Sequence, residues 1–168
     1  MKLNAMDRAY KKYHKELYLY ALSLCRQKSI AMDLVNETFY KAFITSNQPK
    51  DSFKYWLFKI LKNHFIDIKR KNHEILTIDK YEWNIEGNSN IEPLGKLIKQ
   101  ERDRNLHRIL MNLKPDIYRE VIYLYYFGEM SIKNIAGIIG KTENSTKIIL
   151  YRARKKLGRI LKEDDYEF

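Results

Sequence analysis

Apolar side chains recur at α-helical spacing along most of this 168-residue chain. In the clearest case, seven residues fall within roughly 60° of one line when successive residues are placed about 100° apart. They are Thr146, Ile149, Leu150, Ala153, Leu157, Ile160 and Leu161. The chain holds only 6 Gly and 3 Pro, which disfavours a β-sandwich or a β-barrel. The sequence therefore predicts an all-α protein.

Capping residues divide the pattern into separate helices. The expected helices cover residues 5–27, 30–45, 52–72, 96–112, 117–127 and 132–139, and a last one begins after Thr142. Ser29, Asp116, Ser131 and Thr142 are candidate N-caps, and Gly128 and Gly140 suit helix C-termini. The last two helices are separated by a tight turn that contains glycine, which predicts a helix-turn-helix.

Charge divides the chain into three parts within the total of +11. Residues 1–73 carry net +9, residues 74–103 carry −3 and residues 104–168 carry +5. Residues 74–95 also lack steady periodicity, which favours a linker between two small helical domains; an acidic loop within one domain is the alternative. The two basic lobes favour a polyanionic partner, although a Lys-rich composition can also reflect an A·T-rich genome.

Several function classes are disfavoured. A single cysteine, Cys25, excludes an intrachain disulfide. The N-terminal residues carry charges throughout, so we expect neither a signal peptide nor membrane insertion, and a cytoplasmic protein. The four histidines are scattered, so no metal site or cofactor is predicted and a metal-dependent nuclease is disfavoured.

Residues 52–72 present two opposite faces on a helix. One face is the expected core: Phe53, Leu57, Ile60, Leu61, His64 and Ile68. The other face carries Tyr55, Lys59, Lys62, Asn63, Lys69 and Arg70. Cations neutralise phosphates and aromatic rings stack on unpaired bases, so this second face suits single-stranded nucleic acid. A solvated basic face would explain the same pattern.

The last helix presents hydrogen-bonding and cationic groups opposite its apolar face. They are Asn144, Lys147, Ile148, Tyr151, Arg152, Lys155 and Arg159. The second helix of a helix-turn-helix reads the major groove with such groups. A charged terminal helix would explain the cations but not the tight turn before them. Ile148 could contact a thymine methyl group; an isoleucine that is merely exposed is the alternative.

Four fragments, in this order and spacing, resemble the extracytoplasmic-function (ECF) sigma factors of bacterial RNA polymerase. They are Ala-Met-Asp-Leu-Val-Asn-Glu at 31–37, Trp-Leu-Phe-Lys-Ile with Asn-His-Phe-Ile-Asp at 56–67, Leu-Lys-Pro through Tyr-Arg-Glu-Val and Gly-Glu-Met-Ser at 113–131, and Leu-Tyr-Arg-Ala-Arg-Lys-Lys-Leu at 150–157. The resemblance implies a region 2-like three- or four-helix bundle at 1–73, an acidic linker at 74–95 and a region 4-like helix-turn-helix at 96–168.

The resemblance also implies three binding surfaces. Core RNA polymerase, through its β′ and β subunits, would bind Asp33, Asn36, Glu37 and Lys41. The promoter −10 element would bind Lys54, Tyr55, Lys59, Lys62, Asn63, Lys69 and Arg70. The −35 element would bind Thr142, Asn144, Ser145, Lys147, Ile148, Tyr151, Arg152 and Lys155. The linker would pass through the polymerase toward the RNA path, and an anti-sigma factor is an expected partner.

Some positions depart from the family pattern. Ile148 and Ile149 stand where Ser-Arg is common, and Tyr125 stands where an arginine is usual, so the −35 contact is expected to be less electrostatic. The protein is expected to direct promoter opening without being an enzyme. A stand-alone helix-turn-helix regulator, binding as a homodimer, is the alternative; it would leave Asp33, Asn36 and Glu37 without a function.

Overall fold

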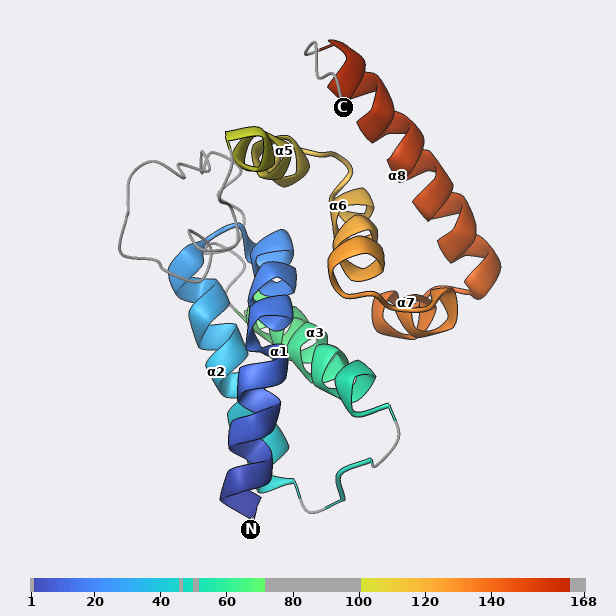
Figure 1. Ribbon diagram of the computed structural model, residues 1–168. Coiled ribbons are helices and arrows are strands. Elements are labelled where there is room, and N and C mark those ends of the chain that lie inside the picture. Colours follow the sequence, from blue (N-terminus) through green and yellow to red (C-terminus); the bar gives the residue numbers. More distant parts are fainter. Residues whose placement is uncertain (1, 46, 50–51, 72–100, 164–168) are drawn as a thin grey trace.

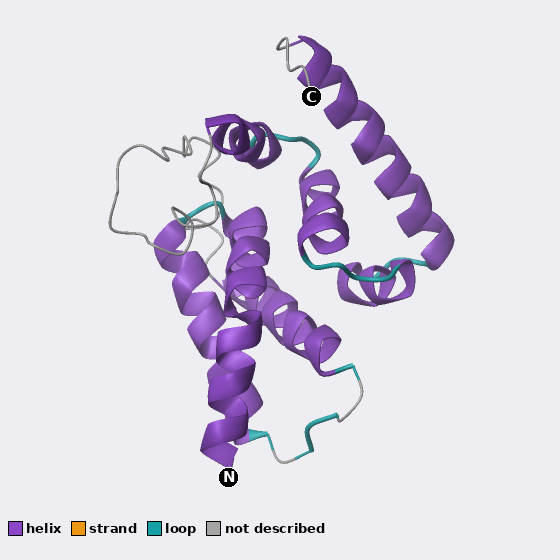
Figure 2. Cartoon of the chain, viewed as in Figure 1, coloured by secondary structure: helices purple, strands orange, loops and turns teal. Residues whose placement is uncertain are grey.

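The computed structural model describes residues 2–45, 47–49, 52–71 and 101–163, and all of its regular elements are helices (Figures 1 and 2). The helices are α1 (Lys2–Cys25), α2 (Lys28–Ile44), α3 (Phe53–Lys71), α5 (Glu101–Met111), α6 (Asp116–Ile122), the π-helix η1 (Tyr123–Phe127), α7 (Ile132–Ile139) and α8 (Glu143–Glu163). The predicted all-α class is confirmed. The expected linker at 74–95 lies outside the described residues.

The first lobe consists of α1, α2 and α3, which pack on one another as a small bundle. Between α1 and α2 the chain turns at Arg26, whose φ of 59° is left-handed. The N-cap of α2 is Gln27, and no side chain caps this end. The prediction of Ser29 as the N-cap was therefore wrong. The backbone N–H of Ala31 already bonds to the Gln27 carbonyl at 2.9 Å, which places Ser29 inside the helix.

The second lobe consists of α5, α6, η1, α7 and α8. Ser131 accepts a hydrogen bond from the Asn134 N–H and caps α7, as predicted. Gly140 ends α7 with φ 71°, which confirms the tight turn. Asp116 was predicted as an N-cap, but it is the first residue of α6 and Pro115 precedes it. Proline fixes its own φ near the value that this position needs.

The helix expected at 117–127 is not uniform. Its second half is the π-helix η1, in which the Gly128 N–H bonds to the Tyr123 carbonyl at 2.9 Å, five residues back. The apolar run Tyr-Leu-Tyr-Tyr-Phe gives no local signal for this wider turn. A π-helix rotates the side chains that follow it, and such segments are frequent at functional sites. Here η1 packs against α1 of the first lobe.

The two lobes contact one another directly. Figure 1 shows α6 between α1 and α8, and α7 beside the first turns of α3. Near its C-terminus α1 is buried on all sides, because every residue from 17 to 23 is buried. A helix that is buried all round must be covered from more than one direction. The second lobe supplies the cover that α2 and α3 leave open.

The same contact shifts the buried face of α3. Leu57 and Leu61 are buried as predicted, but Ile60, His64 and Ile68 are only half-buried. Phe58, which was not predicted as core, is fully buried. Its ring lies 5.3 Å from that of Tyr20, which reaches the second lobe. On α8 the predicted stripe is confirmed, with Thr146, Leu150, Ala153 and Leu161 buried and the other three half-buried.

Candidate nucleic-acid and polymerase interfaces

The outer face of α8 is open to solvent. All eight residues predicted to bind the −35 element are exposed: Thr142, Asn144, Ser145, Lys147, Ile148, Tyr151, Arg152 and Lys155. Ile148 is 50% exposed and Tyr151 is 65% exposed. Because α8 packs its opposite stripe on α6 and α7, the polar and aromatic groups form one continuous row. A duplex could meet this row without any movement of the second lobe.

The start of α8 is fixed by its own side chains. The Thr142 Oγ1 accepts from the Ser145 N–H at 3.1 Å, and the two hydroxyls bond to each other at 3.0 Å. This is the expected N-cap, and it satisfies one of the free N–H groups of the first turn. The remaining free N–H groups of this turn carry partial positive charge, which favours an anion.

Sequence reasoning missed one cation beside this row. The Arg154 guanidinium lies 5.9 Å from the ring centroid of Tyr125 and 5.6 Å from that of Tyr126. It lines an open hollow of about 550 Å³ together with Lys147, Tyr151 and Lys155. Arg154 therefore places positive charge next to Tyr125, the position where the family usually has arginine. The sequence feature that could have identified Arg154 is its position four residues after the core residue Leu150.

The cationic face of α3 is less accessible than the outer face of α8, because several of its side chains already have partners within the protein. Lys54 pairs with Glu16 of α1 at 2.6 Å. The Lys59 ammonium donates to the Tyr55 hydroxyl at 3.3 Å and lies 5.6 Å from the centroid of the same ring. These four side chains are half-buried. Of the seven residues predicted to bind the −10 element, three are exposed: Asn63, Lys69 and Arg70.

Lys62 is held by the second lobe. Its ammonium lies 2.8 Å from Glu120 Oε1, and the two side chains are 15% and 8% exposed. The Tyr20 hydroxyl donates to the same carboxylate oxygen at 2.7 Å. Burial raises the pKa of Tyr20 well above its usual value, and the Glu120 charge and hydrogen bond raise it further. Sequence reasoning assigned no role to Glu120.

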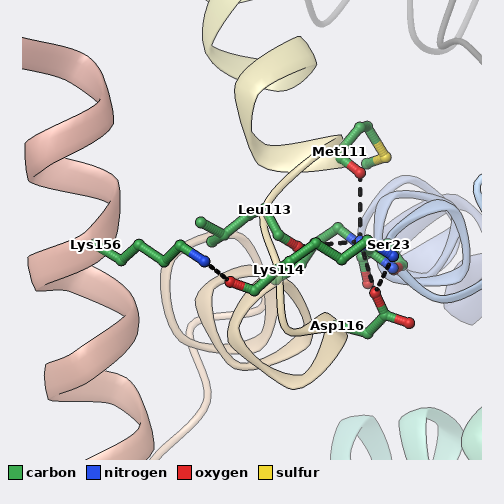
Figure 3. A network of polar contacts seen from close by, with 7 residues as sticks. Ser23, Met111, Leu113, Lys114, Asp116 and Lys156 are labelled. Carbon is green, nitrogen blue, oxygen red and sulfur yellow. Dashed lines mark hydrogen bonds and ion pairs between the residues drawn. The ribbon is translucent and has the colours of Figure 1, made fainter. Parts of the chain in front are cut away.

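The neighbouring residue, Arg119, makes a second polar contact between the lobes (Figure 3). Its Nε donates to the carbonyl oxygen of Ser23 in α1 at 2.5 Å. Its Nη1 donates to the carbonyl oxygens of Met111 and Leu113 at 3.3 and 3.4 Å. Burial lowers the pKa of Arg119, and the nearby Asp116 carboxylate opposes that shift. Arg119 thus joins α1, the end of α5 and α6.

The turn between α5 and α6, to which Arg119 donates hydrogen bonds, is also contacted by α8. Lys156 of α8 donates to the carbonyl oxygen of Lys114, and Lys114 in turn bonds to Asp116 at 3.1 Å (Figure 3). Desolvation alone would raise the pKa of Asp116, but the Lys114 hydrogen bond and the Arg119 charge hold it below its usual value. The turn between α5 and α6 is therefore linked to α8 by Lys156 and to α1 by Arg119.

The patch predicted to bind polymerase lies on the outer side of α2. Asp33 and Asn36 are exposed, and Glu37 and Lys41 are half-buried. Two apolar side chains extend this patch: Met32 is 41% exposed and Tyr40 is 59% exposed. A surface with two carboxylates, an amide and exposed apolar groups suits a protein partner that carries cations.

Lys41 connects this patch to α3. Its ammonium lies 2.9 Å from His64 Nδ1. Burial lowers the pKa of His64, and the Lys41 charge lowers it further, while Glu37 and Asp67 partly oppose the shift. The geometry requires an unprotonated Nδ1 that accepts from the ammonium.

Within residues 2–45, 47–49, 52–71 and 101–163, no group of three or more His, Cys, Asp or Glu side chains could hold a metal ion. No helix in those ranges is both long enough and apolar enough to cross a membrane.

Comparison with known proteins identifies the family. The model for Sigma-70 region 2 matches residues 9–74, and that for Sigma-70 region 4 matches residues 103–157. The ECF RNA polymerase sigma factor SigM of Bacillus subtilis is 31% identical over 164 residues, which cover 92% of this chain and 94% of SigM. The chain belongs to the ECF sigma factors. RNA polymerase sigma factor SigV of the same organism is 30% identical, over 91% of this chain and 89% of SigV.

Two solved structures share the fold of this sigma factor. RpoE of Bartonella quintana, in complex with the anti-sigma factor NepR, has a TM-score of 0.66 and 25% identity, over 93% of this chain and 96% of RpoE. CnrH, in complex with the cytosolic domain of CnrY, has a TM-score of 0.66 and 22% identity, over 96% and 90% of the two chains. The sequence-based prediction of a two-lobed ECF sigma factor is confirmed, and the stand-alone regulator is not favoured.

Proposed function

We propose that this sigma factor binds core RNA polymerase through α2, reads the −35 element with α8 and captures the −10 element on α3. In this proposal residues 1–73 bind polymerase and the −10 element, residues 96–168 bind the −35 element, and residues 74–95 link them through the polymerase. The matched ranges of regions 2 and 4 support these boundaries. The protein itself performs no chemistry, because the polymerase supplies the active site.

One observation carries the proposal: the eight predicted −35 residues form an exposed row on a capped helix that follows a tight turn. Lys147, Arg152 and Lys155 supply positive charge for phosphates. Asn144, Ser145 and Tyr151 supply hydrogen-bonding groups for base edges. These are the two kinds of contact that a recognition helix needs.

The −10 role rests on the combination of charge and aromatic rings on α3. Lys59, Lys69 and Arg70 can neutralise a strand's phosphates, and the Tyr55 ring can stack on an unpaired base. The exposed amide of Asn63 lies among them and can form hydrogen bonds with a base edge. Capture of unpaired bases would stabilise the melted promoter, so the polymerase can begin synthesis.

An anti-sigma factor is the proposed regulator. The solved structure of RpoE contains the anti-sigma factor NepR, and that of CnrH contains the cytosolic domain of CnrY. For polymerase, the proposed contact is between the Asp33 and Glu37 carboxylates and the coiled coil of the β′ subunit, supported by Met32 and Tyr40.

The function is tested with the full-length chain, core polymerase and A·T-rich promoter fragments. We expect a stable complex with the core enzyme and a run-off transcript that requires both proteins. Replacing Asp33 with Arg is expected to weaken the complex, because the new charge repels a basic partner. The matched control is Asp7→Arg, the same change at another exposed aspartate of the first lobe, outside the α2 patch. Absence of both complex and transcript with the unmodified chain would contradict the proposal.

A further inference from the structure

We propose that Arg154 is a further DNA-binding residue: its guanidinium, held by the rings of Tyr125 and Tyr126, binds a backbone phosphate of the −35 duplex. The inference rests on the proposed −35 role of α8. It adds a phosphate contact on one side of the recognition helix. It also gives the π-helix η1 a function, which is to position that contact.

Arg154 lies on the flank of α8, between the buried stripe and the exposed row. With successive residues about 100° apart, it is about 80° from Thr146 in the stripe and about 100° from Lys155 in the row. Lys147, two turns earlier, lies on the same flank. An α-helix of about 10–12 Å diameter fills a major groove of about 12 Å. Residues on the flank therefore face the sugar-phosphate wall of the groove, whereas the row faces the base edges.

An open hollow on this flank can receive the phosphate. It has a volume of about 550 Å³, and its lining residues are Ile132, Lys147, Leu150, Tyr151, Arg154 and Lys155. All of the charged residues in this lining are cations, which favours an anion. Arginine suits a phosphate in particular, because its planar guanidinium can donate two parallel hydrogen bonds to the phosphate oxygens.

Two tyrosines of η1 restrain the guanidinium. Arg154 Cζ lies 5.9 Å from the ring centroid of Tyr125 and 5.6 Å from that of Tyr126. The two ring centroids are 5.0 Å apart and the rings are nearly perpendicular, at 81°. A cation is attracted to a ring when it lies within about 6 Å of the centroid, so both rings attract the same group. A side chain restrained in this way loses less entropy when it binds a phosphate.

The π-helix explains how two adjacent tyrosines reach one partner. Neighbouring side chains of an α-helix diverge by about 100°. In η1 the Gly128 N–H bonds to the Tyr123 carbonyl, five residues back, so each turn is wider and neighbouring side chains diverge less. Tyr125 and Tyr126 can then both face Arg154. Tyr126 is 47% exposed, so the rings hold the guanidinium without closing the hollow.

The main experiment measures binding of labelled −35 duplexes by full-length Arg154→Gln over a range of salt concentrations. We expect the plot of log association constant against log salt concentration to become less steep by about 0.9, because one phosphate contact is lost. At about 0.1 M salt this corresponds to roughly tenfold weaker binding. The loss should be the same for every duplex in a set of varied −35 sequence, since a phosphate carries no sequence information.

Two further variants separate charge from position. Arg108→Gln makes the same change at an exposed arginine of α5 and should leave the slope unchanged. Arg154→Lys keeps the charge but not the planar group. We expect it to keep the slope of the unmodified chain while binding every duplex more weakly.

The positioning role of the rings is tested with Tyr126→Leu. We expect roughly threefold weaker duplex binding, because Arg154 must then be ordered when DNA binds. Tyr126→Phe keeps the ring and should bind like the unmodified chain. In the Arg154→Gln background, Tyr126→Leu should weaken binding no further, since its effect acts through Arg154. A tyrosine that contacted DNA itself, or only stabilised the second lobe, would weaken binding equally in both backgrounds.

The outcomes separate this inference from the proposed function. An unchanged slope for Arg154→Gln, or a loss confined to some −35 sequences, overturns the phosphate contact, while weaker binding by Arg152→Gln would still support the −35 role of α8. Equal losses from Tyr126→Leu in both backgrounds overturn the positioning role of the rings. If the unmodified chain binds no −35 duplex, the proposed −35 role fails and the inference fails with it.

Discussion

Helices α3 and α8 carry similar rows of cations with an aromatic residue among them, yet the structure gives the two rows different surroundings. On α8, Lys147, Tyr151 and Arg152 are exposed. On α3, Tyr55 lies against α7 and Lys62 pairs with Glu120. The same pattern of residue types thus produces one surface that is exposed and one that is partly covered.

This difference shows that a row of basic residues on a helix indicates which partner could bind, but not whether the row is accessible to that partner. An ammonium bound to a carboxylate must exchange that partner for a phosphate, so the gain on DNA binding is only the difference between the two interactions. An exposed ammonium exchanges only water and counterions. Four variants or conditions test this contrast, in order of decreasing effect.

The largest effect is expected for Arg119→Ala, which removes one of the two cations that join the lobes. Three carbonyl oxygens, those of Ser23, Met111 and Leu113, lose a donor. A buried acceptor left without a partner costs about 1–3 kcal/mol, whereas relief of the buried charge returns part of that cost. We expect a net loss of about 3 kcal/mol in the free energy of unfolding, measured with urea, and α3 cations that become as accessible as those of α8.

Two further variants sharpen this result. Arg119→Lys should not restore stability, because an ammonium cannot reproduce the separate Nε and Nη1 hydrogen bonds. Arg108→Ala removes an exposed arginine of α5 and should change stability by less than about 0.5 kcal/mol. Equal losses for Arg108→Ala and Arg119→Ala would show that the lobes are not held together at this point.

Arg152→Gln should reduce the affinity of the free chain for −35 duplex by about 1–3 kcal/mol if the guanidinium contacts a base edge. Fluorescence anisotropy with labelled duplex measures the change. Arg70→Gln, the matched change on an exposed α3 residue, should leave duplex affinity nearly unchanged. A similar loss for both variants would mean that duplex binding does not distinguish the two rows.

Ile148→Ser tests base discrimination within the α8 row. The isoleucine is 50% exposed, so a thymine methyl group can reach it. We expect the variant to lose part of its preference for thymine-containing −35 sequences over variants that lack thymine, by no more than about 1 kcal/mol. Competition binding with a set of −35 duplexes measures this; an unchanged preference across the set would rule out the methyl contact.

Acid pH should lower the free energy of unfolding of the first lobe, because protonation of His64 favours the unfolded chain. Burial and the Lys41 charge lower the pKa of His64 below 6.5, so the unfolded chain takes up a proton before the folded chain does. Stability must therefore fall as the pH decreases below 6.5. Comparing urea unfolding of the unmodified chain and His64→Gln at pH 7.5 and pH 5.5 isolates this contribution. The same drop in both proteins would assign it to other groups.

Helical periodicity predicted α8 well because this helix has one buried stripe and one open face. It predicted α3 less well, since α3 is covered on two sides. Phe58, off the predicted stripe, is fully buried, and His64, on it, is half-exposed. A periodic pattern identifies the face that meets one neighbour; it does not identify a second neighbour that arrives from another domain.

The sequence nevertheless contained signals for the contact between lobes. Residues 17–22 read Leu-Tyr-Leu-Tyr-Ala-Leu, an apolar run with no polar face. Arg119 and Glu120 are the two charged residues in the otherwise apolar stretch 117–127. Each signal has several explanations when it is read alone. Taken together they indicate a helix covered all round and a charged pair buried against it.

Gly137 has a consequence for the motions of the free protein. Helix α7 has only eight residues, a length that is marginal without packing, and its glycine weakens it by about 1 kcal/mol relative to alanine. Its backbone hydrogen bonds therefore depend on contact with α3, η1 and α8. When the lobes separate, α7 loses its contact with α3. Hydrogen exchange at the amides of α7 should then accelerate while that of α8 does not, so the exchange rate of this one short helix would report how often the sigma factor opens.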